Sequence, residues 1–128
     1  MRKRKALVVT AADDWSALFA GELIGKGCDV HTASEAAEAV DLLRKHQYDL
    51  MVVDQDVGGM DVVEFVLTVR DIASGEPVLL VSDVPTANKQ KVWDRCGVFV
   101  AGTRAVVAKR LGEAIAAVPA HEDAAYGG

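Results

Sequence analysis

Residues 48–54 read "YDLMVVD", and this stretch decides the fold class of the chain. Its apolar residues continue from Leu50 to Val53 without a polar break, and the run ends at Asp54. Such a run indicates a strand that is buried on both of its faces. Strands of this kind are typical of a parallel sheet that helices cover on each side. The stretch therefore predicts a buried strand with Asp54 at its end.

Four further strands and five helices are predicted around this stretch. Three of the other strands are also continuous apolar runs, and only residues 28–33 alternate. Because helical patterns alternate with the strands and crossovers are right-handed, the chain is expected to form an open, doubly wound parallel sheet. The predicted class is α/β, a flavodoxin-like (βα)5 fold with five strands in a single domain. The strands are expected at 5–10, 28–33, 48–54, 78–83 and 98–103, and the helices at 13–24, 34–46, 61–73, 85–95 and 105–118.

The starts of two helices are expected from their capping residues. Asp13 or Asp14 is predicted to be either an N-cap or an acid in the first turn, and Ser34 is predicted to be an N-cap. Behind Asp14, apolar residues recur at helical spacing, which predicts a buried face. These residues are Trp15, Leu18, Phe19 and Leu23.

Composition excludes several functional classes. The chain has 128 residues, 51% of them hydrophobic, and a formal net charge of −5, which does not favour nucleic-acid binding. We expect neither a signal peptide nor a membrane helix, since no apolar run reaches about 18 residues. Cys28 and Cys96 are far apart and lack the C-x-x-C spacing of redox or zinc sites. Two isolated thiols are consistent with a cytoplasmic location.

The candidate site is expected where the strands end. In open doubly wound sheets, sites lie just beyond the carboxyl ends of the strands. The chain has no G-x-G-x-x-G, no P-loop and no Ser-His-Asp set, so we do not expect an independent enzyme. The residues placed at the predicted strand ends are Thr10, Ala11, Asp54, Asp56, Ser82, Asp83, Thr103 and Arg104.

Several stretches together resemble one family, the receiver domain of two-component response regulators. They are "GCDVHTASEAAEAVDLL", "YDLMVVDQDVGGMD", "PVLLVSD" and "RCG", in the family's order. The resemblance covers residues 4–118, and we interpret 119–128 as a flexible tail or a truncated linker. It implies that Asp54 holds the phosphoacceptor position, that Ser82 supplies the hydroxyl that contacts the phosphoryl group, and that Arg104 replaces the family's lysine.

The resemblance fails where the family's chemistry is carried out. Two adjacent acids that hold Mg²⁺ in the family correspond here to Thr10 and Ala11. The remaining metal candidates, Asp13, Asp54 and Asp56, are weak, so we expect no cofactor and doubt a role for Mg²⁺.

Further departures affect the family's lysine position, its switching residues and the loop after the phosphoacceptor. Arg104 keeps the positive charge of the family's lysine and is able to form a standing salt bridge with Asp54. Ala101 replaces the family's switching aromatic residue, and Ala105 replaces its proline. In the loop after Asp54, Gly58 and Val62 stand where the family has proline and glycine.

These departures suggest an atypical receiver, or pseudo-receiver, that acts as a protein-interaction module in phosphorelay-type signalling. We expect a protein partner, with a histidine kinase or a second copy as candidates, on the face formed by the fourth helix, fifth strand and fifth helix. That face is expected to include Val106 and Val107, and we expect contact with neither nucleic acid nor membrane.

Two alternatives stay open. In the first, Asp54 accepts phosphate from a histidine kinase, and Asp13 or Asp14 restores metal binding. In the second, the chain binds a small molecule or a nucleotide.

Overall fold

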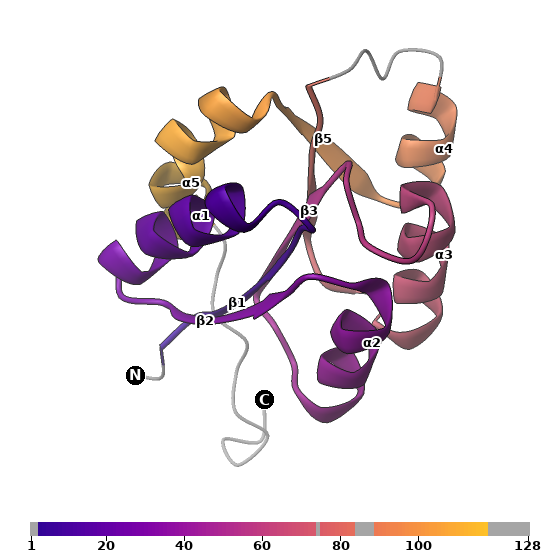
Figure 1. Ribbon diagram of the computed structural model, residues 1–128, viewed down its shortest axis with the longest axis horizontal. Coiled ribbons are helices and arrows are strands. Elements are labelled where there is room, and N and C mark those ends of the chain that lie inside the picture. Colours follow the sequence, from indigo (N-terminus) through magenta and orange to yellow (C-terminus); the bar gives the residue numbers. More distant parts are fainter. Residues whose placement is uncertain (1–2, 74, 84–88, 118–128) are drawn as a thin grey trace.

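The computed structural model describes residues 3–73, 75–83 and 89–117. Its strands and helices alternate along the chain, as Figure 1 shows. The five strands form one parallel sheet in the order β2-β1-β3-β4-β5, which confirms the predicted doubly wound α/β fold. The elements are β1 (Lys5–Val9), α1 (Asp13–Gly25), β2 (Asp29–Ala33), α2 (Ala36–Lys45), β3 (Leu50–Asp54), α3 (Val62–Ile72), β4 (Val78–Val81), α4 (Gln90–Arg95), β5 (Val98–Gly102) and α5 (Arg104–Ala117).

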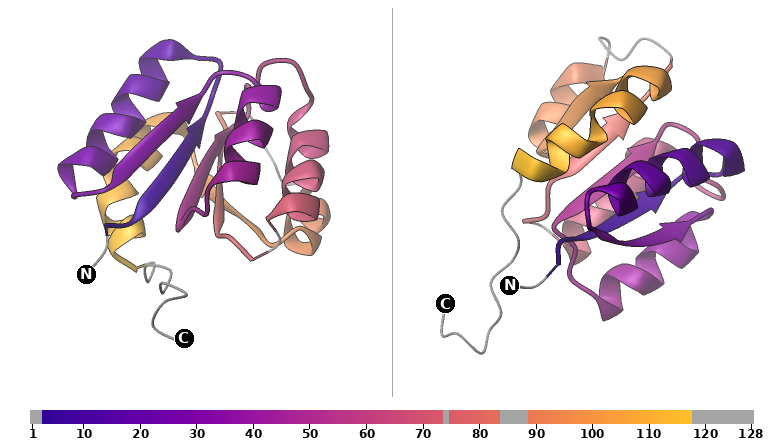
Figure 2. Two further views of the ribbon diagram at one scale, coloured as in Figure 1. Left: turned by 90° about the horizontal axis from the view of Figure 1, so that it is seen from below. Right: turned by 90° about the vertical axis from the view of Figure 1, so that its left-hand side faces the viewer.

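Helices cover both faces of the sheet, with α1 and α5 on one side and α2, α3 and α4 on the other (Figure 2). The apolar residues of β3 are buried, as their run predicts, and Asp54 at the end of the strand is buried with them. Alternate residues of β3 enter two separate cores, because successive side chains of a strand point to opposite faces. Val52 packs with Phe19 beneath α1 and α5, while Val53 packs with Phe65 beneath α2 and α3.

The structure decides between the alternatives for the start of α1 and corrects the predicted N-cap of α2. The N-cap of α1 is Ala12, and Asp13 and Asp14 both lie in the first turn, so only the first-turn alternative is correct. The N-cap of α2 is Glu35 and not Ser34, whose backbone amide donates to Oε1 of Glu38 at 2.9 Å. Tertiary contacts with the loop after β3 set the position of the α2 N-cap, because Gly58 forms a β-bridge with Glu35 just before α2 begins.

The buried face of α1 is narrower than its apolar residues predict. Phe19 and Leu23 are fully buried, but Leu18 is 46% exposed. Adjacent residues on a helix point about 100° apart, so the face that buries Phe19 turns Leu18 toward solvent.

Some predictions concern parts of the chain outside this description. The predicted start of the fourth helix at Pro85 and Thr86 lies outside the described residues, and α4 is described from Gln90 onward. The tail at 119–128 also lies outside them. Within the described residues, no helix combines the length and the apolarity that crossing a membrane requires.

Candidate functional site

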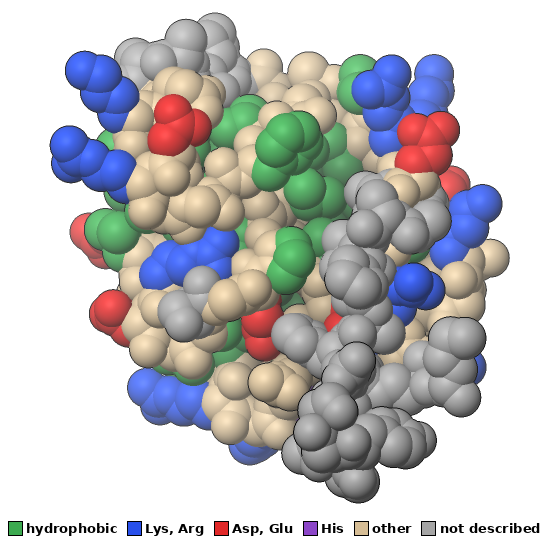
Figure 3. All heavy atoms as spheres, turned by 180° about the vertical axis from the view of Figure 1, so that it is seen from behind, with side chains coloured by type: hydrophobic (Ala, Val, Ile, Leu, Met, Phe, Trp, Pro, Cys, Tyr) green, Lys and Arg blue, Asp and Glu red, His purple; other side chains and the backbone are tan. Residues whose placement is uncertain are grey.

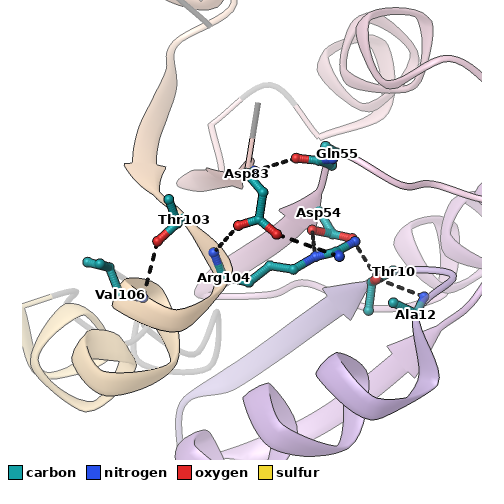
Figure 4. A network of polar contacts seen from close by, with 8 residues as sticks. All are labelled: Thr10, Ala12, Asp54, Gln55, Asp83, Thr103, Arg104 and Val106. Atoms are coloured by element: carbon teal, nitrogen blue, oxygen red, sulfur yellow. Dashed lines mark hydrogen bonds and ion pairs between the residues drawn. The ribbon is translucent and has the colours of Figure 1, made fainter. Parts of the chain in front are cut away.

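Polar side chains from four parts of the chain meet at the carboxyl edge of the sheet (Figure 4). Thr10 follows β1, Asp54 ends β3, Asp83 lies just after β4, and Arg104 begins α5. Parallel strands all end at this edge, so residues that are 44 to 50 positions apart in sequence come into hydrogen-bond contact here.

Asp54 is fully buried, and the side chains around it bind both of its carboxylate oxygens. Nε of Arg104 donates to Oδ1 at 3.0 Å, and Nη2 of Arg104 donates to Oδ2 at 2.6 Å. The hydroxyl of Thr10 also donates to Oδ2, at 2.8 Å. A bidentate guanidinium–carboxylate pair is among the stronger polar contacts in proteins, because two charge-assisted bonds fix its geometry. The standing salt bridge that Arg104 is able to form with Asp54 is thus present.

Thr10 connects this pair to the start of α1. Its hydroxyl oxygen accepts a hydrogen bond from the backbone amide of Ala12 at 3.0 Å while its proton goes to Asp54. Thr10 is itself only 1% exposed. The single hydroxyl at this position therefore serves both the carboxylate and one of the free amides at the helix start.

Asp83 provides the second carboxylate that faces Arg104. Its Oδ1 accepts from the backbone amide of Arg104 at 3.0 Å, and its Oδ2 lies 3.7 Å from Nη1. The guanidinium carbon also lies 6.0 Å from the ring centroid of Trp15, within range of a cation–π contact. The hydrogen bond to Asp54 raises the pKa of Arg104 above its usual value, against the opposing effect of burial, and the charges of Asp54, Asp83 and Asp56 raise it further. Arg104 is therefore a permanent cation.

Hydrogen bonds donated by backbone amides connect the ends of β3, β4 and β5. The amide of Asp83 donates to the side-chain oxygen of Gln55, the residue after Asp54. Ser82 is buried, and its backbone amide donates to the carbonyl of Gly102 at 2.9 Å. The sequence analysis did not include Gln55 among the candidate residues, although its position directly after Asp54 places it at the same strand end. It also assigned Trp15 to packing alone.

The remaining candidate acids differ from Asp54 in their exposure to solvent. Asp13, Asp14 and Asp56 are all exposed. Asp56 contributes its backbone to the region, since its carbonyl accepts from the amide of Ala11 at 2.8 Å. Among the described residues, no group of three or more His, Cys, Asp or Glu side chains is arranged to hold a metal ion.

On the predicted partner face, one valine is exposed and the other is not. Val106 is 44% exposed, but Val107 is 3% exposed and packs in the core beneath α5, which corrects its predicted place on the surface. Phe99 of β5, the strand that belongs to this predicted face, is 67% exposed.

Comparison with known structures supports the fold. CheY4, the chemotaxis response regulator of Vibrio cholerae, has a TM-score of 0.80 at 21% identity, over 92% of this chain and 100% of CheY4. A CheY-like receiver domain protein from Methanospirillum hungatei has a TM-score of 0.80 at 16% identity, over 90% of this chain and 92% of its own. TrrA of Thermotoga maritima, a response regulator solved in complex with Mg²⁺-BeF, has a TM-score of 0.74 at 19% identity, over 88% and 96% of the two chains.

The family assignment comes from the sequence itself. No curated protein sequence matches the chain. The model of the response regulator receiver domain matches residues 6–116, which include every described strand except the first residue of β1. Receiver domains are signalling modules of two-component systems that interact with histidine kinases and other proteins. The chain belongs to the response regulator receiver domain family.

Proposed function

We propose that this receiver domain signals through protein contacts without Mg²⁺-dependent phosphorylation of Asp54. The observation that carries the proposal is the bidentate pair between Arg104 and Asp54, to which Thr10 adds a third hydrogen bond. In this arrangement the carboxylate has a permanent cation as its partner. The domain thus functions as an atypical receiver within two-component signalling.

The residues at the carboxyl edge do not fit Mg²⁺. This ion prefers several hard oxygen ligands in near-octahedral geometry. Ala11 offers no side-chain oxygen, and the hydroxyl of Thr10 is already hydrogen-bonded to Asp54 and Ala12. Both oxygens of Asp54 are bonded to Arg104, while Asp13 and Asp14 lie exposed on the first turn of α1. A cation at this place would also meet the charge of Arg104 at close range.

Loss of the metal ligands bears directly on phosphorylation. A phosphoryl donor that approaches Asp54 carries negative charge into a region that already contains Asp83 and Asp56. Phosphoryl transfer depends on cations to neutralise that charge, and the nearest cation, Arg104, is committed to Asp54. Asp54 in this proposal is a structural carboxylate, and Ser82 has no phosphoryl group to contact.

The Arg104–Asp54 pair fixes the start of α5 against the end of β3 in a single arrangement. Ala101 supports the same conclusion, because a methyl group has no rotamer that could switch between two positions. We propose that the face formed by α4, β5 and α5 contacts a protein partner in this fixed state. Exposed Phe99 and Val106 give this face apolar area for such a contact.

A beryllofluoride titration tests the proposal. Wild-type protein is titrated with beryllofluoride in the presence of Mg²⁺, while tryptophan fluorescence and the amide resonances near Asp54 are followed. Trp15 is a suitable reporter because its ring lies 6.0 Å from the guanidinium carbon of Arg104. We expect no saturable change in the wild type.

A variant that restores the missing ligands provides the matched control. The combined substitutions Thr10→Asp, Ala11→Asp and Arg104→Lys supply two acids and a compact ammonium, so this variant should respond saturably. The response should vanish when Asp54→Asn is added. A saturable wild-type response that Asp54→Asn abolishes would overturn the proposal and establish the phosphoacceptor alternative.

A further inference from the structure

Two histidines from different elements lie next to each other at the β2 edge of the sheet. His31 lies on β2, which is an edge strand paired with β1, and His46 is the C-cap residue of α2. The centroids of their rings are 4.9 Å apart, and the ring planes are tilted by 58°. Both residues are partly exposed. The fold therefore presents a pair of imidazole rings where solvent and small ions have access.

The buried Tyr48 side chain fixes the orientation of one of these rings. Its hydroxyl lies 2.7 Å from Nδ1 of His31, and Tyr48 itself is 0% exposed. Burial raises the pKa of Tyr48 to about 12, so the hydroxyl keeps its proton at neutral pH. The contact occupies Nδ1, which leaves Nε2 as the ring nitrogen of His31 that an ion can reach.

The separation of the two rings suits a shared metal ion. Zn²⁺ binds histidine nitrogen at about 2.0–2.1 Å, so two imidazoles on one ion at octahedral or tetrahedral angles have ring centroids about 4.5–5.2 Å apart. The observed 4.9 Å lies within that range. A histidine that binds metal usually donates its other ring N–H to a neighbouring group. The oxygen of Tyr48 is placed to accept such a bond from Nδ1 of His31.

We propose that His31 and His46 bind a divalent transition metal ion of the Zn²⁺ or Cu²⁺ type, and that Tyr48 is the positioning residue for His31. Imidazole nitrogen suits these ions, whereas Mg²⁺ prefers oxygen ligands. Among the described residues, the pair has no third His, Cys, Asp or Glu arranged to complete a metal site. Water would occupy the remaining coordination positions, and we expect weaker binding than in a closed four-ligand site.

The charges around the pair act in both directions. Burial, followed by the charges of His31, Lys5 and Lys45, lowers the pKa of His46. His46 is therefore neutral at neutral pH, which is the form that binds a metal ion. Lys5 and Lys45 also repel a cation, while the carbonyl end of α2, where His46 lies, attracts one.

A bound ion would connect β2 to the end of α2. Since the unfolded chain does not hold the two rings together, the ion should bind the folded state preferentially and stabilise it. The pair is separate from the apolar surface of the molecule. Hydrophobic side chains gather in the upper part of the face seen in Figure 3, with Lys and Arg side chains on both sides, and no His side chain is seen among them.

Isothermal titration of the full chain with zinc chloride, without Mg²⁺ or beryllofluoride, tests the proposal. We expect saturable binding of one Zn²⁺ per chain. His31→Gln and His46→Gln should each raise the dissociation constant about tenfold or more, because each removes one of two protein ligands. Tyr48→Phe keeps both ligands but should still weaken binding about 10- to 100-fold, as loss of an orienting partner does. Circular dichroism without metal verifies that each variant is folded.

Two substitutions at other candidate ligands serve as matched controls. His121→Gln removes the third histidine of the chain, and Cys96→Ser removes its partly exposed thiol. Neither substitution should change the affinity for Zn²⁺. Binding that survives both His31→Gln and His46→Gln, or that either control abolishes, would identify an adventitious ion only and overturn the proposal.

Nitrogen NMR of the wild type provides a measurement that does not depend on the folding of a variant. Zn²⁺ should shift the ring-nitrogen resonances of His31 and His46 together, over the same range of Zn²⁺ concentration. No saturable shift at millimolar Zn²⁺, or a shift at only one of the two rings, would overturn the proposal. The inference does not depend on the proposed function, since a positive beryllofluoride response refutes that function alone and a failure to bind Zn²⁺ refutes this site alone.

Discussion

Arg104 binds Asp54 through two separate nitrogens, with Nε 3.0 Å from Oδ1 and Nη2 2.6 Å from Oδ2. The two side chains differ in their surroundings. The Asp54 side chain is 0% exposed, whereas that of Arg104 is 17% exposed and lies close to Asp83. Removal of one partner should therefore cost more when the carboxylate is the group left behind.

Arg104→Met is expected to lower the free energy of unfolding by about 3 kcal/mol, because it leaves a buried carboxylate without its cation. Asp54→Asn should cost less, about 1–2 kcal/mol, because Arg104 keeps Asp83 within reach and retains some contact with water. Urea unfolding of both single variants and of the double variant gives the coupling energy between the residues. Additive losses, without coupling, would contradict a direct ion pair.

Thr10→Val is expected to destabilise the fold by about 1–3 kcal/mol, although the two side chains have nearly the same shape. The substitution removes the donor to Asp54 and the acceptor for the amide of Ala12. Thr10→Ser keeps the hydroxyl and loses only a buried methyl, so it should cost about 1 kcal/mol. Chemical denaturation of both variants measures the difference in their stability. Equal losses of stability would show that the hydroxyl contributes nothing.

Stability above pH 10 is expected to depend on Tyr48. Burial, followed by the charge of Glu76, raises the pKa of Tyr48 to about 12 from its usual value of 10.0. Because the folded state holds this proton more tightly than the unfolded state, the stabilisation is complete below pH 10 and is lost as pH rises toward 12. The full loss amounts to about 3 kcal/mol, at 1.36 kcal/mol for each pKa unit.

Tyr48→Phe is the control for this pH dependence, since it removes the titrating group. The difference in stability between wild type and variant should shrink between pH 10 and 12, as measured by urea unfolding at each pH. The variant also loses the contact of 2.7 Å between the Tyr48 hydroxyl and Nδ1 of His31, which displaces its whole curve. A constant difference across this range would contradict the raised pKa.

Gly58→Ala, in the loop after β3, is expected to lower the free energy of unfolding by about 1–3 kcal/mol, the usual cost of overpacking. A Cβ at Gly58 would lie 2.6 Å from the backbone carbonyl oxygen of Ser34. The backbone cannot move away easily, since Gly58 forms a β-bridge with Glu35 and its carbonyl accepts from Ala36. Thermal unfolding provides the measurement.

Gly21→Ala is the matched control for Gly58→Ala. Gly21 lies within α1, and a Cβ there would meet nothing within 4 Å. The same substitution should therefore stabilise the protein by about 0.5–1 kcal/mol through helix propensity. Destabilisation at both positions would indicate that steric contact with Ser34 is not the cause at Gly58.

The sequence by itself determined the fold and the position of Asp54. The apolar run before Asp54 required burial on both faces, and that pattern is satisfied by a parallel sheet between two helical layers. The ends of parallel strands must then meet at one edge. Asp54, Ser82 and Arg104 could accordingly be placed near that edge without coordinates. The resemblance to receiver domains added that Thr10 and Ala11 stand where that family has two acids.

Only the tertiary structure decided how these side chains bond to one another. Sequence placed Arg104 near Asp54, but the bidentate geometry depends on where α5 begins relative to β3, 50 residues earlier. The hydrogen bond from Thr10 to Asp54, the exposure of Leu18 and the burial of Val107 likewise depend on packing between elements. Local pattern fixes which face of an element is apolar, whereas contacts between distant side chains are set by the angles and separations at which whole elements pack.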